Sequence, residues 1–177
     1  MNSLSKKRKV FIAIISVVLL LTLVFVWGNS LKPRAQSSSQ SGGLYLTFQK
    51  IIESIFGESF ATKFFSHYTE FDFRKTAHIF EYTLIGLEVN LLYLAIFTLK
   101  PLNSVYSFGA GLFVAVVDET IQKIVGRNGT VSDVLLDLIP VIIISALFLL
   151  VWFIKNKKNK NGSLTANQKG EKIRRNF

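Results

Sequence analysis

The sequence has 177 residues, half of them hydrophobic, with 16 Phe, no Cys and a net charge of +10. This composition is too apolar for an ordinary soluble domain of that size and favours a membrane protein. The lack of Cys excludes disulfides, thiolate nucleophiles and Cys-ligated zinc. Any chemistry must therefore come from His, carboxylate, amide, hydroxyl and basic side chains.

The excess positive charge is confined to the two ends of the chain. Four basic residues occupy positions 6–9, and eight Lys or Arg with a single Glu follow from position 155 onward. The stretch between them has nine basic and ten acidic residues. Because each basic end flanks an apolar run, this distribution is typical of the cytoplasmic ends of a membrane protein. No basic stripe with interleaved aromatic residues lies in a segment expected to fold, so the sequence argues against nucleic-acid binding.

The first apolar segment, Val10–Trp27, is unbroken by charge and about long enough to cross a membrane as a helix. It is long for the apolar part of a signal peptide, and no A-x-A-like cleavage site follows it. We therefore predict an uncleaved transmembrane helix, so that residues 1–28 form a cytoplasmic basic start and the first span.

The segment between the first and second spans, residues 29–73, is predicted to lie outside the cell. It contains SSSQSGG, which is typical of a flexible linker. From Leu44 to Phe60, apolar residues then recur every three or four positions, which predicts an amphipathic helix. This helix is expected to lie along the outer membrane surface or to cap the bundle, and a simple packed loop helix is an equally good interpretation.

Three further apolar segments predict the second to fourth spans at Thr76–Leu99, Ser104–Val125 and Val131–Ile154. The second and third spans are separated only by a short connection at Lys100-Pro101, which favours antiparallel neighbours. Four spans place both termini on the cytoplasmic side, in agreement with the basic ends. The predicted fold is all-α. It is an integral membrane four-helix bundle with an extra amphipathic outer-surface helix, a core of residues 74–154 and a basic cytoplasmic tail at 155–177.

Polar and ionisable residues gather at the outer ends of the last three spans. They are His78 and Glu81 in the second span, Asp118, Glu119 and Gln122 in the third, and Arg127, Asp133 and Asp137 around the start of the fourth. Within each helix these residues are three or four positions apart, so each helix offers one narrow polar face. Such groups are costly in hydrocarbon and are expected to face one another or a water-filled cavity.

This polar cluster has one structural interpretation and several functional ones. Interhelical ion pairs and hydrogen bonds would hold the bundle together, but they do not require so many groups at one end. A His with two or three carboxylates can hold zinc or manganese, although HxxE spacing is a weak signal, so the metal and any cofactor stay open. A His and carboxylate pair can act as general acid and base, and Arg or Lys can bind a phosphate or carboxylate. The absence of G-x-S-x-G and P-loop motifs argues against a serine esterase or an NTPase.

Three motifs, RKTAHIFEY at 74–82, DETIQ at 118–122 and GRNGTVSDV at 126–134, together resemble the VanZ-like family of bacterial membrane proteins. The resemblance extends to the end of the fourth span and highlights Lys75, His78, Tyr82, Asp118, Glu119, Gln122, Arg127 and Asp133. The resemblance implies that the protein is located in a bacterial cell membrane and has a role in lowered susceptibility to teicoplanin and related lipoglycopeptides. The sequence departs from the family pattern at Asp137 and Pro140, where Asn and then Gly are usual. A proline there is expected to kink the fourth span and disturb its close packing.

From the residues and the resemblance together, we predict a polar pocket at the outer leaflet, surrounded by membrane lipids. Its ligand is expected to be lipid-like, a lipid-linked or peptidoglycan-related cell-wall molecule, or a lipoglycopeptide. The predicted chemical centre is His78 with Glu119, tuned by Glu81 and Asp118, and the predicted ligand-binding residues are Arg74, Lys75, Tyr82, Gln122, Arg127 and Asp133. Three functions stay open: ligand binding without catalysis, an enzyme acting on a lipid-linked substrate, and, from Glu88 and Asn90 alone, a small transporter.

Overall fold

The computed structural model describes residues 5–97 and 101–174, with side chains as far as residue 159. Within these ranges the chain is almost entirely helical and contains no strand. The helices are α1 (Lys6–Ser30), α2 (Arg34–Phe56), α3 (Glu58–Phe65), α4 (Glu70–Phe97), α5 (Pro101–Ile124) and α6 (Val131–Arg174). The predicted all-α fold is confirmed.

Among the described residues, four helices are long and apolar enough to cross a membrane: α1, α4, α5 and Val131–Asn159 within α6. They correspond to the four predicted spans, with small shifts at the ends. The predicted end of the second span at Leu99 lies outside the described residues. Helix α5 begins at Pro101 rather than at Ser104, because the fixed backbone angle and missing N–H of proline suit the first turn of a helix. The chain is thus a multi-pass membrane protein.

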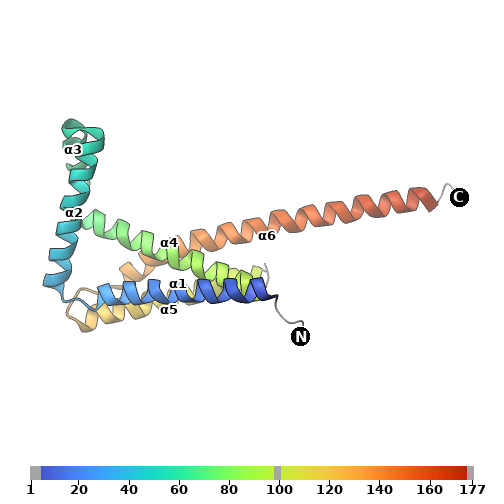
Figure 1. Ribbon diagram of the computed structural model, residues 1–177, viewed down its shortest axis with the longest axis horizontal. Helices are drawn as coiled ribbons and strands as arrows, with labels where there is room; N and C mark the ends of the chain where they lie inside the picture. The colour runs from blue at the N-terminus through green and yellow to red at the C-terminus, as the bar shows by residue number, and fades with distance from the viewer. Residues whose placement is uncertain (1–4, 98–100, 175–177) are drawn as a thin grey trace.

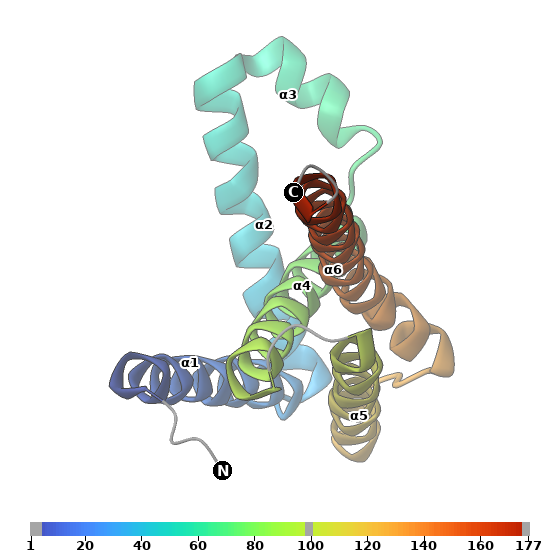
Figure 2. The same cartoon turned by 90° about the vertical axis from the view of Figure 1, so that its right-hand side faces the viewer.

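Helix α4 is at the centre of the bundle, because it packs against α1, α5 and α6, while α5 also packs against α6. Figure 1 shows how α6 extends far beyond the other spans, and Figure 2 shows the helices nearly end-on. The start of α1 and the far end of α6 lie toward one end of the bundle in Figure 1. The end of α1, the start of α4, the end of α5 and the start of α6 meet at the opposite end. The polar ends of the last three predicted spans therefore converge.

The packing of α6 against α4 and α5 depends on Val141, which is fully buried. A Cβ added to Gly111 would lie 2.7 Å from Val141 Cγ1, and a Cβ added to Gly86 would lie 3.1 Å from Val141 Cα. The two glycines therefore permit this close approach of the helices. Pro140 precedes Val141 directly, yet α6 continues through it. The expectation that this proline disturbs close packing is wrong, since the glycines that allow the approach stand on the facing helices.

Polar side chains deeper in the bundle form hydrogen bonds between helices. Thr22 Oγ1 on α1 donates to Glu88 Oε1 on α4 at 2.8 Å. Asn90 Nδ2 on α4 donates to Ser145 Oγ on α6 at 3.1 Å. These bonds join α4 to its neighbours, so Glu88 and Asn90, the residues behind the transporter interpretation, have a structural role.

The outer segment differs from its prediction at SSSQSGG, which belongs to helix α2 instead of forming a flexible linker. Two side-chain contacts hold this part of α2 in place. Lys32 Nζ donates to Gln40 Oε1 at 2.6 Å, and Ser41 Oγ donates to Glu70 Oε1, at the start of α4, at 2.7 Å. The order of this stretch therefore depends in part on Glu70, which lies 29 positions further along the chain.

The predicted amphipathic helix is divided at Gly57 between α2 and α3. Gly57 has a φ of +86°, which glycine adopts readily and which turns the chain back. The aromatic rings of the returning segment pack against α2, with ring centroids 5.7 Å apart for Tyr45 and Phe65 and 5.5 Å apart for Phe48 and Phe73. Figure 1 shows α2 and α3 standing across the end of the bundle instead of continuing its spans.

Candidate functional site

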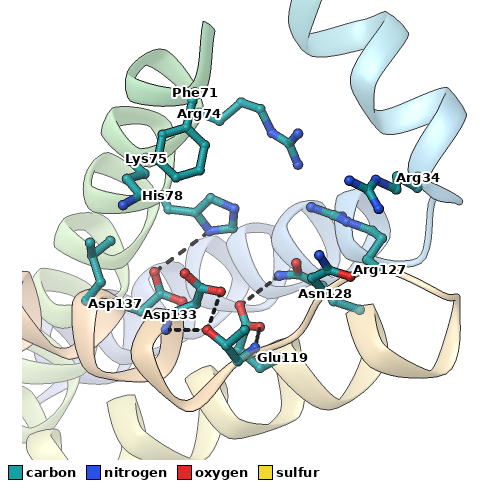
Figure 3. Close-up of a pocket in the computed structure, with 13 residues that line it drawn as sticks. Arg34, Phe71, Arg74, Lys75, His78, Glu119, Arg127, Asn128, Asp133 and Asp137 are labelled. Atoms are coloured by element: carbon teal, nitrogen blue, oxygen red, sulfur yellow. Dashed lines mark hydrogen bonds and ion pairs between the residues drawn. The ribbon is translucent and has the colours of Figure 1, made fainter. Parts of the chain in front are cut away.

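A cavity of about 420 Å³ opens at the end of the bundle where the polar residues meet. Its cationic lining residues are Arg34, Arg74, Lys75 and Arg127, and its acidic lining residues are Glu119, Asp133 and Asp137. The other lining residues are Phe71, His78, Gln122, Asn128, Thr130 and Leu136. Figure 3 shows the three guanidinium groups on one side of the cavity and the carboxylates on the other. Helices α2, α4, α5 and α6 and the α5–α6 loop all contribute.

Three residues from three helices meet at the acidic side of the cavity: His78 on α4, Asp118 on α5 and Asp137 on α6. One nitrogen or oxygen atom from each residue lies within 4.8 Å of the other two. His78 Nδ1 lies 3.8 Å from Asp137 Oδ1 and 3.9 Å from Glu81 Oε2, and these contacts are ionic only when His78 is protonated. Asp118 and Asp137 are fully buried. Each helix of the predicted core thus brings one chemically active group to the same point.

Hydrogen bonds from α5 and the following loop hold two of the carboxylates. Gln122 Nε2 donates to Asp118 Oδ2 at 2.9 Å and to Glu119 Oε1 at 3.1 Å. The backbone N–H of Thr130 donates to Glu119 Oε2 at 3.1 Å. This last bond requires the loop to pass close over α5, and a Cβ added to Gly129 would collide with the backbone carbonyl of Glu119. The position of Glu119 therefore depends on the path of the loop.

The same loop also fixes the start of α6. The Thr130 hydroxyl accepts a hydrogen bond from the backbone N–H of Asp133 at 3.2 Å and donates to Asp133 Oδ2 at 2.7 Å. Threonine is a favoured residue immediately before a helix because its hydroxyl satisfies a free N–H of the first turn. The cap sets where α6 begins, so Asp133 and Asp137, one turn apart, both face the cavity.

The three arginines lie on one side of the cavity, apart from its carboxylates. Within the described residues, no ion pair joins Arg34, Arg74 or Arg127 to a carboxylate. Arg127 Nη1 instead donates weakly to the carbonyl of Asn29 at 3.5 Å. Burial lowers the pKa of the Arg127 guanidinium, and the nearby charge of Arg74 adds to this effect. An anion bound between the two side chains would offset both effects, because its negative charge favours the charged form of the Arg127 guanidinium.

A sequence model of the family described as VanZ/LLP1 matches residues 10–154. The chain belongs to the VanZ/LLP1 family. The resemblance carried by the three motifs is thereby confirmed, and the match extends from the first span of this VanZ/LLP1 protein through the fourth. No curated protein and no solved structure matches the chain significantly.

Four buried polar atoms on α4, α5 and α6 at this end of the VanZ/LLP1 protein have no hydrogen-bond partner within the described part of the chain. They are His78 Nδ1, Tyr82 Oη, Asp118 Oδ1 and Asp137 Oδ2. Because buried polar groups are normally hydrogen-bonded, such atoms require water, an ion or a ligand as a partner. The hydrogen-bonding capacity of the site is therefore not satisfied by the described residues alone.

Most of the predicted site residues line the cavity, namely Arg74, Lys75, His78, Glu119, Gln122, Arg127 and Asp133. Asp118 lies beside it in the cluster with His78. Glu81 instead lines a smaller cavity of about 110 Å³ between α1, α2 and α4. Tyr82 is fully buried and belongs to the hydrophobic core of the VanZ/LLP1 bundle. The chemical roles assigned to these residues stay predictions.

The set of predicted site residues omits four polar residues that line the cavity, Arg34, Asn128, Thr130 and Asp137, and the apolar Phe71 and Leu136. Asp137 follows Asp133 by four positions, and this helical spacing is the signal that finds it. Asn128 and Thr130 lie in the motif that precedes the fourth span. Arg34 lies just before the segment interpreted as a linker, and no local signal in the sequence places it near the other residues.

Proposed function

We propose that this VanZ/LLP1 protein binds an anionic group of its ligand in the cavity, from the outer side of a bacterial cell membrane. The ligand is a lipid-linked or otherwise lipid-like cell-wall molecule, or a lipoglycopeptide. Binding lowers susceptibility to teicoplanin and related lipoglycopeptides, as the family resemblance implies. The observation that carries the proposal is the group of arginines that line the cavity without a carboxylate partner among the described residues.

The outward orientation is supported by the positions of the basic ends. The cavity lies at the end of the bundle opposite to the start of α1 and the far end of α6. Basic segments that flank a membrane span are retained in the cytoplasm, where they also meet anionic lipid. With the termini inside, the cavity opens toward the outer leaflet, where α2 and α3 cover part of the surface.

The choice of an anionic ligand is supported by the chemistry of the lining. Three guanidinium groups from α2, α4 and the α5–α6 loop point toward the same side of the cavity in Figure 3. Guanidinium binds carboxylate and phosphate through paired hydrogen bonds, and like charges in proximity are stabilised when an anion lies between them. Lys75 is less available, because its ammonium group lies 4.4 Å from the centroid of the Phe71 ring.

A second candidate function is an enzyme that acts on a lipid-linked substrate in the same cavity. It is favoured by His78, whose Nδ1 faces the carboxylate of Asp137 at 3.8 Å. An imidazole oriented by a carboxylate is a common general acid and base. Both candidates use the same cavity, so they differ only in whether the bound molecule is changed.

The proposal is tested in a susceptible host that expresses the wild-type protein or the variants Arg74→Gln and Arg127→Gln. We expect either substitution to lower the minimum inhibitory concentration of teicoplanin to that of cells without the protein. Lys63→Gln on the exposed surface of α3 is the matched control and should keep the wild-type value. Full resistance with both arginine variants, at wild-type protein levels in the membrane, would contradict the proposal.

Mass spectrometry of the membrane lipids and cell-wall precursors separates the two candidates. Binding alone predicts identical molecular species in cells with and without the protein. An enzyme predicts a species that gains or loses a chemical group in the wild type and returns to its original mass in the His78→Ala variant. Ligand binding is the candidate that we favour, because it rests on three arginines from different parts of the chain, whereas the enzyme rests on the single contact of His78 with Asp137.

A further inference from the structure

The strongest chemical feature outside the arginine group is the cluster of His78, Asp118 and Asp137. Each residue comes from a different helix, and one nitrogen or oxygen atom of each lies within 4.8 Å of the other two. Only His78 and Asp137 line the cavity, whereas Asp118 stands behind them in the bundle. The three side chains therefore meet at the edge of the cavity, with two of them in its lining.

Each residue of the cluster has one buried polar atom without a hydrogen-bond partner among the described residues. His78 Nδ1, Asp118 Oδ1 and Asp137 Oδ2 are buried and have no hydrogen-bond partner in the described part of the chain. Asp118 and Asp137 are exposed by only 0% and 1%. The second oxygen of Asp118 accepts a hydrogen bond from Gln122 at 2.9 Å, which holds the carboxylate and leaves Oδ1 free.

The charge balance of the cluster also requires a positive partner. Two buried carboxylates and an imidazole carry up to two negative charges, and buried charges are very costly unless they are paired. The arginines do not supply this pairing, because no ion pair in the described residues joins them to either carboxylate. They lie on the opposite side of the cavity in Figure 3.

We infer that His78, Asp118 and Asp137 form a site for one divalent transition-metal ion, Zn²⁺ or Mn²⁺, at the acidic side of the cavity. One imidazole nitrogen with carboxylate oxygens is a donor set that suits these ions. Ligand atoms around one such ion stand roughly 3.3 Å apart, so small side-chain rotations would bring the three atoms from their present spacing to the metal. Gln122 orients Asp118 by its hydrogen bond, as partners of metal-binding carboxylates commonly do.

Three protein ligands leave at least one coordination position open toward the cavity. Such a position can take a water molecule or an oxygen atom of a bound ligand, whose negative charge would then lie between the metal and the arginines. The inference does not depend on the proposed function, because metal binding is a property of the protein alone. It can hold for a protein that has no effect on antibiotic susceptibility.

The test uses the full chain, purified in detergent, stripped with EDTA and dialysed against Zn²⁺ or Mn²⁺. We expect one ion per chain by elemental mass spectrometry. His78→Ala and Asp137→Asn should lower the affinity by roughly a hundredfold or more, and Gln122→Ala by roughly tenfold to a hundredfold, since it only orients a ligand. The chain supplies a matched control in its other histidine, because His67 is exposed and its ring contacts only the neighbouring Ser66 and Lys63 among the described residues. His67→Ala should bind as the wild type does.

The result that overturns the inference is a wild-type protein that binds neither ion, as expected if protons neutralise the carboxylates instead. Equal binding by wild type, His78→Ala and Asp137→Asn also overturns it, and so does an equal loss in His67→Ala. If the variants do not fold, the wild type still decides, because an ion bound only to the native state raises the melting temperature as its concentration rises. A melting temperature independent of both ions and of EDTA excludes the site.

Discussion

The imidazole of His78 on α4 lies 3.8 Å from the carboxylate of Asp137 on α6, although 59 positions separate them in the chain. If the two side chains act as one unit, through a shared metal or a shared proton, removing either one removes the function of both. We expect His78→Asn and Asp137→Asn to reduce teicoplanin resistance by similar amounts. The double variant should be no more susceptible than either single variant, as measured by minimum inhibitory concentration. Additive losses would show that the residues act independently, and His67→Asn is the control.

The contact of Gly111 with Val141 predicts a sharp effect of a single methyl group on stability. In Gly111→Ala, the new Cβ would stand 2.7 Å from Cγ1 of a fully buried and stiff Val141, so helices α5 and α6 must move apart. Overpacking of this kind costs about 1–3 kcal/mol. Gly109→Ala on the same helix is the control, because its Cβ would meet nothing within 4 Å. Thermal unfolding in detergent should show a lower melting temperature for the first variant only.

The path of the α5–α6 loop over Glu119 predicts that Gly129→Ala disturbs the position of Glu119, although Gly129 itself does not line the cavity. The added Cβ collides with the Glu119 carbonyl, so the loop must lift and the hydrogen bond from Thr130 to Glu119 is lost. We expect loss of teicoplanin resistance together with a lower melting temperature. Gly43→Ala on α2, where a Cβ has open space, should change neither property. Normal resistance in Gly129→Ala would show that the position of Glu119 does not matter for function.

The hydrogen bond between Thr22 and Glu88 predicts a purely structural role for the deepest carboxylate of α4. Thr22→Val leaves a buried carboxylate oxygen without its donor and should cost about 1–3 kcal/mol of stability. Thr120→Val on α5 is the control, since that exposed hydroxyl bonds only within its own helix. Glu88→Gln should keep teicoplanin resistance. A loss of resistance in Glu88→Gln, with normal insertion and stability, would instead support a functional role for Glu88, as the transporter interpretation requires.

The proposed orientation predicts opposite labelling of the two ends of the bundle. The natural chain has no Cys, so a single introduced thiol reports its own position without background. A membrane-impermeant maleimide added to intact cells should label Ser39→Cys on α2, whereas Asn156→Cys on α6 should react only after lysis. The reverse pattern would place the cavity on the cytoplasmic side and remove the basis for binding an outer-leaflet ligand.

Much of the architecture could be predicted because it depends on local properties of the sequence. Apolar runs of sufficient length predict the four spans, and steps of three and four place His78, Glu119 and Asp133 on inward faces. The helix at SSSQSGG could not be predicted, since its contacts come from Lys32 and from Glu70 in another helix. The same holds for Arg34, which reaches the cavity only because the chain turns after α1.

Helical spacing also could not predict that Glu81 lies apart from the other acidic residues. Glu81 shares a face of α4 with His78 in sequence terms, and its carboxylate remains 3.9 Å from His78 Nδ1. Spacing does not show which neighbouring helix each edge of that face meets. The edge with Glu81 faces α1 and α2, whereas His78, three positions earlier, faces Asp137 on α6. Such assignments depend on how α4 is rotated within the bundle.

One turn of α6 separates the acidic side of the cavity from its tightest packing contact. Asp137 lines the cavity, and four residues further Val141 is wedged between Gly86 and Gly111 with no room for another methyl group. This tight contact therefore closes the path along α6 from the cavity toward the other end of the bundle. A molecule that enters between the arginines would meet this contact and could not pass along α6 to the other face of the membrane.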